Sequence, residues 1–435
     1  MTLRYNESAM KIYRSWIKAD ARALDAMLAG RRAGFDAGVI RKTGAIVESV
    51  RRRGDAALLA ATAKYDGVKL TARTIRVPEA EFRRAWAGLE QEKKAAMRLA
   101  WGNILAFHKR QEYRGYVLRR NYGVLRQVVR PLGRVGIHIS AAAAPLVSTL
   151  LMCAGAARAA KVGRIVLVSP PRYRGSIAPE ILAAARLAGI KEAYRAGGAQ
   201  AVAALVFGTA TIPAVDKVVG PGNVFTQAAK MLTQGGGGLD GPSEILILAD
   251  DTACPDAVAA DVIAQAEHAG DNPVVLVSPS RRLVLGVLDS VNRQIRGLPR
   301  GQIVAKSLSL CGAIVLVRNL REGLEIADRF APEHLAIASR GALGLALKAR
   351  RAGTILVGGA SPVAAADYGA GPNHVLPTAG TARFDSGLGV KDFLKFTNIT
   401  ALTPKGIRRL GPKLAVLARM EGLEGHARSM EMKRG

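Results

Sequence analysis

The chain has 435 residues, 49% of them apolar and 5% aromatic. This length predicts more than one domain, and the apolar content argues against a disordered chain. Lysine and arginine number 63 against 34 acidic residues, a net charge of +29, which attracts anionic ligands. The basic residues are spread along the chain, and only residues 107–122 interleave them with aromatics. We therefore do not expect nucleic acid as the main partner.

The cysteines and the apolar runs bear on the compartment. Cys153, Cys254 and Cys311 are far apart and odd in number, which indicates neither a disulfide framework nor a CxxC metal site. No apolar run reaches the roughly 18 to 20 residues of a membrane span. Glu7 and Asp20 are atypical of an acidic-poor targeting segment. We expect a cytoplasmic protein with no membrane partner.

The first third of the chain is typical of helices, which we expect over 8–30, 40–64 and 79–112. From residue 134, short β-branched runs alternate with helical stretches. The expected strands are 134–139, 164–169, 216–219, 244–249, 273–278, 313–317 and 353–357. The expected helices are 151–160, 178–188, 199–206, 255–268, 281–296 and 342–350. This alternation predicts α/β architecture with two doubly wound parallel sheets, joined near residue 240.

The ends and the glycine-rich segments add little regular structure. Residues from 384 onward show weak helical patterning and no strand runs, and such a tail must dock to be ordered. Docking on a second subunit is one possibility. Residues 234–238 carry four consecutive glycines, without the GxxxxGK[ST] of a P-loop. No GxGxxG opens a βαβ unit, so the standard dinucleotide fingerprint is missing.

Two polar islands contain groups suited to metal binding or proton transfer. Gln265 and His268 are three residues apart, so they face one side of a helix and could share a metal ion. A polar helix end, with histidine meeting the helix dipole, is the alternative. Glu333 and His334 are adjacent titratable groups, which suits general acid and base work near neutral pH. A surface turn would explain them equally well.

Other polar segments are weaker indications by themselves. The glycine-rich island 367–374 follows an expected strand, and the carboxyl ends of strands are where α/β sheets bind ligands. The segments 220–223 and 241–244 place small residues where backbone can approach a ligand, although turn chemistry alone would explain them. The island 421–426 is uninformative alone.

In this order and spacing, these segments resemble the histidinol dehydrogenase family. The matching segments are VRRRGDAALLAATAKYDGV (50–68), FHKRQ (107–111), GGAQAVAALVFGT (197–209), VDKVVGPGN (215–223), GPSEILILAD (241–250), AQAEH (264–268), APEHL (331–335), DYGAGPNHVLPT (367–378) and SGLGVKDFLKFT (386–397). The resemblance implies zinc- and NAD-dependent oxidation of L-histidinol, through the aldehyde, to L-histidine, with two NAD reduced. It also implies one zinc per subunit and a homodimer whose C-terminal tail completes the neighbour's site.

The resemblance assigns roles to individual positions. The matching zinc ligands are Gln265, His268, Asp367 and His426. Glu333 and His334 match the acid–base pair: His334 would take the hydroxyl proton, and Glu333 would activate water. The substrate positions are Ser243, His374 and Glu421, together with the zinc ligands and His334. The cofactor positions are Gln200 and Asn223, and His138 where the family has a tyrosine.

The implied fold has two Rossmann-like domains with small helical extensions and a swapped dimer. We expect an N-terminal extension over 1–29 and a first domain from 30–132 with 245–383, carrying the zinc and acid–base residues. We expect the cofactor domain over 133–244 and a dimerisation tail over 384–435.

Three departures from the family keep other readings open. Residues 138–142 lack the family's tyrosine and glycine-rich turn, so His138 could stack on the cofactor or be a plain strand residue. The loop before Gly241 is shorter, and Val363 replaces a glutamate. A relative that oxidises another alcohol, such as a sulfonated diol, is one alternative. A catalytically weak scaffold or anion-binding protein is another.

Overall fold

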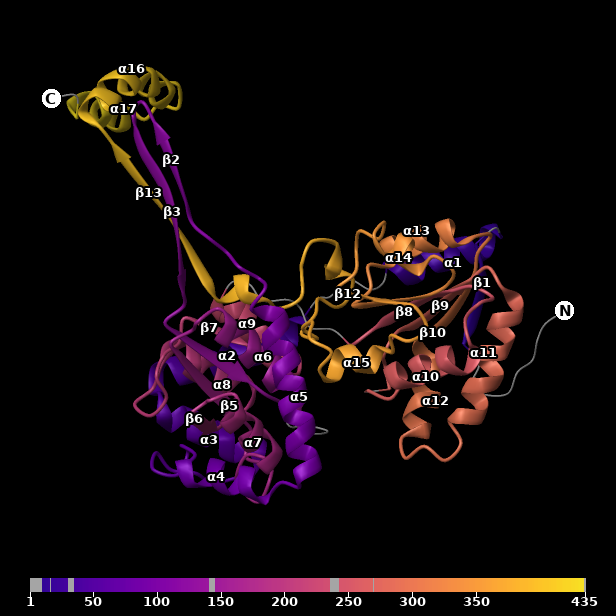
Figure 1. Ribbon diagram of the computed structural model, residues 1–435. Helices are drawn as coiled ribbons and strands as arrows, with labels where there is room; N and C mark the ends of the chain where they lie inside the picture. The colour runs from indigo at the N-terminus through magenta and orange to yellow at the C-terminus, as the bar shows by residue number, and fades with distance from the viewer. Residues whose placement is uncertain are drawn as a thin grey trace.

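The computed structural model describes residues 10–15, 17–29, 35–140, 145–234, 242–268 and 270–433. They form two α/β units and a long arm (Figure 1). Within these residues, no helix is both long and apolar enough to cross a membrane.

The first unit is built on a four-stranded parallel sheet of order β6-β5-β4-β7. Its strands are β4 (Arg134–His138), β5 (Arg164–Ser169), β6 (Glu192–Arg195) and β7 (Lys217–Val219). The helices that follow them are α6 (Val147–Ala159), α7 (Pro179–Leu187), α8 (Gly198–Phe207) and α9 (Val224–Gln234). The expected β-branched runs become strands with both faces covered, as is usual for parallel sheets.

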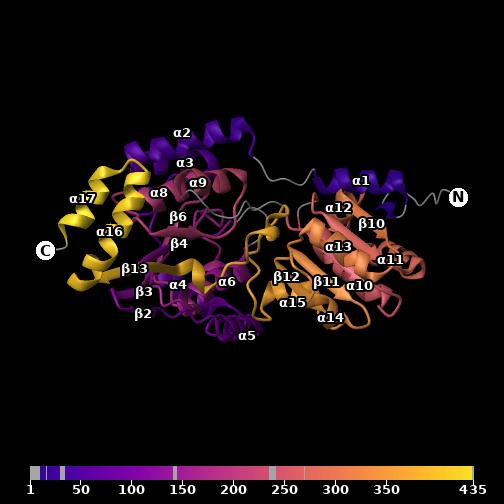
Figure 2. The ribbon, with the colours of Figure 1, turned by 90° about the horizontal axis from the view of Figure 1, so that it is seen from above.

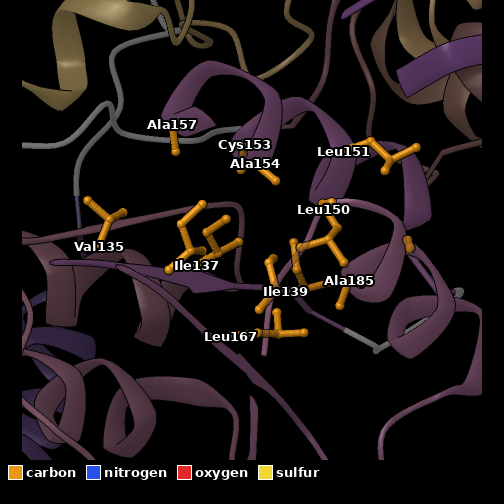
Figure 3. Packing of buried hydrophobic residues seen from close by; sticks show 14 of the residues in the cluster. Val135, Ile137, Ile139, Leu150, Leu151, Cys153, Ala154, Ala157, Leu167 and Ala185 are labelled. Carbon is orange, nitrogen blue, oxygen red and sulfur yellow. The ribbon is translucent and has the colours of Figure 1, made fainter. Parts of the chain in front are cut away.

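Close packing of α6 on this sheet depends on small residues. Val135 and Ile137 point from β4 toward α6, where Ala157 and Ala154 lie (Figure 3). On the opposite side of α6, Gly155 lies so close to α5 that a Cβ there would overlap the Ile104 side chain. The alanine-rich sequence of α6 thus allows it to be buried between the sheet and another helix.

Four N-terminal helices complete the first unit. They are α2 (Ala37–Arg53), α3 (Asp55–Asp66), α4 (Glu79–Gly88) and α5 (Gln91–His108). α2 packs on α8 and α9, α4 on α7, and α5 on α6. This differs from the expectation that 30–132 joins the domain of 245–383. The apolar faces of these helices do not indicate which sheet they will cover. The order of segments along the chain therefore did not predict which unit the helices join.

The second unit is a six-stranded parallel sheet of order β1-β10-β9-β8-β11-β12. Its strands are β1 (Lys11–Arg14), β8 (Ile245–Ala249), β9 (Val274–Ser278), β10 (Gly312–Leu316), β11 (His334–Ala338) and β12 (Thr354–Val357). Its helices are α1 (Lys18–Ala29), α10 (Pro255–Ala266), α11 (Arg281–Gln294), α12 (Gly301–Cys311), α13 (Leu320–Phe330), α14 (Ala342–Ala346) and α15 (Val363–Tyr368).

The N-terminal segment is not only a helical extension. Residues 11–14, expected within a helix, form the edge strand β1, which pairs with β10 before α1 begins. Pairing with a distant strand satisfies these backbone groups, and a local sequence pattern carries no sign of it.

The arm is an antiparallel ribbon of order β13-β3-β2 with two helices at its tip (Figures 1 and 2). It consists of β2 (Tyr116–Arg120), β3 (Gly123–Pro131), β13 (Leu394–Leu402), α16 (Pro404–Met420) and α17 (Glu424–Met432), and the short 3₁₀ helices η1 (Thr381–Arg383) and η2 (Val390–Phe393) precede β13. The expectation of a tail without strands was therefore wrong. β2 is exposed along its whole length, and β13 nearly so, which removes the alternating apolar pattern that identifies strands.

Candidate active site

The expected acid–base pair lies at the amino end of β11 in the second unit. Glu333 immediately precedes the strand and His334 begins it, and both are buried. The amino end of β8, with Ser243 just before it, is the neighbouring strand end, because His334 is in register with Ile245. The site is thus on the opposite edge of the sheet from the usual ligand edge of an α/β fold.

A chain of hydrogen bonds fixes the Glu333 carboxylate. Its Oε2 accepts from the Ser243 hydroxyl at 2.6 Å and from the Glu244 backbone N–H at 2.9 Å. The Gln265 side-chain N–H donates to the Ser243 oxygen at 2.8 Å. Burial raises the pKa of Glu333 to about 7, although the neighbouring His334 favours the ionised form. A carboxyl group with this pKa can exchange a proton near neutral pH.

His334 is held between oxygens on both sides of its ring. Its Nδ1 lies 3.3 Å from the Glu244 carbonyl oxygen, and its Nε2 lies 3.2 Å from Asp367 Oδ1. Burial disfavours the charged ring, but Glu333 and Asp367 outweigh burial and raise the His334 pKa to about 9. Burial also opposes ionisation of Asp367, yet the contact with His334 keeps the pKa of Asp367 below its usual range. The pocket therefore stabilises an imidazolium.

Asp367 reaches this edge because α15 runs back along the unit after β12. The sequence expectation placed the 367–374 island at a carboxyl end of the sheet because it follows a strand. The contact with His334, the first residue of β11, instead places Asp367 at the amino edge. Asp367 thus contacts the expected acid–base pair, but at the opposite edge of the sheet from the one that the chain order led us to expect.

Three expected zinc ligands converge beside His334, and their chemistry fits a metal ion. The Gln265 Oε1 is buried and has no hydrogen-bond partner among the described residues. His268 Nδ1 lies 3.1 Å from the Gln265 carbonyl oxygen, to which it donates, so the lone pair of this tautomer is at Nε2. Asp367 lies near His268, because the histidine contributes to lowering the pKa of Asp367. Amide, imidazole and carboxylate donors suit zinc.

The fourth expected ligand lies elsewhere in the same chain. His426 is exposed on α17 and Glu421 is exposed at the end of α16, both at the tip of the arm (Figure 1). Within the described residues, no group of three or more His, Cys, Asp or Glu side chains could hold a metal. Among the four expected ligands, His268 and Asp367 are the pair of His, Cys, Asp or Glu residues that lie near each other. Gln265 supplies an amide, and His426 lies on the arm.

His374 has protein partners on both sides of its ring. Its Nδ1 donates to the Asp367 backbone carbonyl at 2.6 Å, and its Nε2 lies 3.0 Å from the Thr149 hydroxyl. Thr149 belongs to α6 of the first unit. His374 therefore lies beside the expected metal ligands and also touches the other unit.

The expected cofactor residues line one large cavity of about 940 Å³ in the first unit. Gln200 and Asn223 lie at the starts of α8 and α9, after the carboxyl ends of β6 and β7. The Asn223 Oδ1 accepts from the backbone N–H groups of Phe225 and Thr226, which caps α9. This edge and these helix starts are where α/β folds bind nucleotide phosphates.

His138 lines the same cavity, but both of its ring nitrogens are used by the protein. Its Nδ1 donates to the Pro221 carbonyl at 2.9 Å, and its Nε2 accepts the Gly198 N–H at 3.1 Å. Burial lowers the His138 pKa to about 4. The neutral ring thus joins β4 to the starts of α8 and α9, which matches the plain structural interpretation of this residue.

Comparison with known proteins decides the family. A sequence model described as histidinol dehydrogenase matches residues 31–434. The histidinol dehydrogenase of Thermus thermophilus is 42% identical over 417 residues, covering 95% of this chain and 99% of that protein. That of Deinococcus radiodurans is 44% identical over 393 residues, covering 89% of each. The chain belongs to the histidinol dehydrogenase family.

The fold agrees with this membership. The crystal structure of histidinol dehydrogenase from Elizabethkingia anophelis matches with a TM-score of 0.90 at 32% identity, covering 99% of each chain. This confirms the expected α/β class with two Rossmann-like units.

Two of the departures from the histidinol dehydrogenase pattern lie partly outside the described residues. These are the altered turn at 141–142 and the glycines of 235–238, with Gly241. The third, Val363, is buried in the core of the second unit, and its backbone N–H donates to the Asp261 carboxylate at 3.1 Å. The residue therefore packs as a core side chain where the family has an acid.

Sequence reasoning missed two residues at the site. Glu244 is buried, and its Oε1 accepts the Glu333 backbone N–H at 3.3 Å. Its position inside the GPSEIL segment was a signal that could have found it. Thr149 had no such signal, because its contact with His374 joins residues 225 positions apart.

Proposed function

We propose that this protein oxidises histidinol through the aldehyde to histidine, the last steps of histidine biosynthesis, with zinc and two molecules of NAD. Family membership supports the reaction class, since close relatives are named for it. The observation that carries the proposal is the buried pair Glu333 and His334 in contact with Asp367, beside Gln265 Oε1, which has no hydrogen-bond partner among the described residues. This combination would provide proton transfer next to a bound zinc ion.

Zinc bound by Gln265, His268, Asp367 and His426 would hold and polarise the substrate oxygen. NAD in the 940 Å³ cavity would accept the hydride.

The chain's own residues handle protons. The unprotonated form of His334, which its raised pKa makes the minor form near neutral pH, takes the substrate hydroxyl proton, and Glu333 and Asp367 stabilise the imidazolium that results. After the first hydride leaves, Glu333 takes a proton from the water that adds to the aldehyde. Its raised pKa and the Ser243 contact suit this exchange near neutral pH. His334 then releases its proton to solvent and, in the second oxidation, takes a hydroxyl proton from the hydrated aldehyde.

We also propose that the active unit is a homodimer. The arm carries His426 and Glu421 away from the other expected site residues of its own chain (Figure 1). A second copy can receive them, so that each arm completes the neighbour's site. The exposed apolar side chains on α16, such as Leu417 and Met420, support contact with another chain.

We place the activity in the cytoplasm, where Cys153, Cys254 and Cys311, which form no disulfide with one another, would stay reduced. Zinc restoration tests the proposal. Chelated protein should lose histidinol oxidation and regain it when zinc is added. Oxidation of a sulfonated diol, but not of histidinol, would instead indicate a relative with another substrate. Failure on both, by folded and zinc-loaded protein, would favour a non-catalytic role.

A further inference from the structure

Residues 369–375, the crossing segment, join the expected metal site to the first unit. They follow α15, whose Asp367 contacts His334, and they lie against α5 and α6. The Asn103 side-chain N–H donates to the Gly369 carbonyl at 3.0 Å. The Asn373 amide N–H contacts the Met152 carbonyl and His108 Nε2, both at 3.1 Å.

The crossing segment also packs closely against α5. A Cβ built on Gly369 would lie 2.5 Å from the Ala100 Cβ, and one on Gly371 would lie 3.4 Å from the Phe107 Cβ. Both glycines have positive φ, 138° and 135°, which other residues adopt only with strain. The segment therefore has a backbone path that fits directly on α5.

Among the contacts between the crossing segment and helices α5 and α6, the one made by Thr149 lies nearest to His334 and Asp367. Its hydroxyl lies 3.0 Å from His374 Nε2, while His374 Nδ1 donates to the Asp367 backbone carbonyl at 2.6 Å. The threonine side chain is buried. One imidazole thus connects helix α6 of the first unit to the residue that contacts His334.

The same helix is adjacent to the cofactor cavity. α6 follows β4, and Ser140 in the β4–α6 connection lines the cavity. Thr149 is in the first turn of α6. A shift of α6 relative to His374 would therefore change the distance between the cofactor cavity and the residues that we expect to bind the substrate.

We infer that Thr149 is a positioning residue that sets the alignment between substrate and nicotinamide through His374. This inference rests on the proposed function, because only a reaction that joins the two units needs this alignment. Hydride transfer requires near-attack geometry, and a misplacement of about 1 Å can slow such a step on the order of 10²-fold. Thr149 itself touches neither reacting group.

The test compares three threonine variants in the zinc-loaded dimer. Thr149→Val keeps the shape and removes the hydroxyl, whereas Thr149→Ser keeps the hydroxyl. Thr62→Val is the matched control, because the Thr62 hydroxyl is also buried but, among the described residues, donates within α3, to the Leu58 carbonyl at 2.9 Å. The measured quantities are the single-turnover rate of NADH formation, KM for both substrates, the deuterium isotope effect from labelled histidinol, and the melting temperature.

We expect Thr149→Val to slow NADH formation roughly 10- to 100-fold, with KM unchanged and an isotope effect at least as large as that of the wild type. Thr149→Ser and Thr62→Val should retain the wild-type rate. If Thr149→Val does not fold, Asn103→Ala, at an exposed position on α5, should slow the same step to a smaller degree. A wild-type rate in Thr149→Val, or an equal loss in Thr62→Val, would overturn the inference alone. Wild-type protein that forms no NADH would contradict the proposed function as well.

Discussion

Glu333 and His334 derive their reactivity from burial next to specific partners. The carboxyl group has a raised pKa because it is removed from water, and the imidazole has a raised pKa because two carboxylates face it. These effects cannot be obtained from the adjacent letters Glu-His, which are equally compatible with a surface turn. The family resemblance assigned the acid–base role to this pair, and the contacts with Ser243 and Asp367 give a physical reason for that assignment.

Replacing His334 tests its role in proton transfer. His334→Asn should fold, because asparagine can still donate to the Glu244 carbonyl. Loss of a general base typically slows turnover about 10²- to 10⁴-fold. The measurement is kcat for histidinol oxidation, with the melting temperature as the control for folding. A kcat close to that of the wild type would remove His334 from the mechanism.

His138 makes the fold sensitive to acid. Its folded pKa of about 4 is below the unfolded value of 6.5, so the unfolded chain binds the proton more readily between these values. Stability from the neutral ring is complete above pH 6.5 and is lost as pH falls toward 4. The full loss is about 3 kcal/mol.

The comparison is with His138→Gln, which can donate and accept as the ring does. The free energy of unfolding of each protein is measured from pH 7.5 to 4. The wild type should become less stable relative to the variant across this range. A constant difference between the two proteins would show that His138 does not titrate differently on folding.

At the level of elements, β-branched runs predicted most of the buried strands of both sheets. They did not predict β11, a central strand whose one β-branched residue is Ile337. β6 and the strands of the arm were not predicted either. β6 contains no β-branched residue, and β2 and β13 lack an apolar side because water contacts most of their length. The sequence also did not predict that α2–α5 all pack on the first unit, since this depends on tertiary packing.

The tip of the arm depends on close contact between α16 and the β2–β3 turn. A Cβ on Gly406 would overlap the Tyr122 carbonyl, whereas one on Gly102 in α5 would meet nothing within 4 Å. Gly406→Ala should therefore cost about 1–3 kcal/mol through overpacking and reduce activity. Gly102→Ala is the matched control and should be neutral or slightly stabilising. Equal melting temperatures and activities for the two variants would contradict this packing role.

At the scale of the whole molecule, the sequence indicated candidate site residues but not that two of them lie far from the others in the same chain. His426 and Glu421 carry no local sign that they lie at the end of an arm. The expectation that a partner receives them came from the family resemblance, and it remains a prediction.

Complementation between inactive protomers tests the shared site. His426→Ala and Gln265→Ala protomers should each be inactive alone. When they are mixed and allowed to exchange, one site per heterodimer keeps all of its ligands, so part of the activity should return. Purified heterodimers with no recovered activity would show that the arm does not complete a neighbour's site.

The central claim is a four-electron oxidation of histidinol, and its stoichiometry is the most direct test. Purified zinc-loaded protein is given a limiting amount of L-histidinol with excess NAD, and the reaction is followed to completion. The account predicts two NADH formed for each histidinol consumed, with histidine as the product. One NADH with released aldehyde, or no NADH from folded zinc-bound protein, would contradict it.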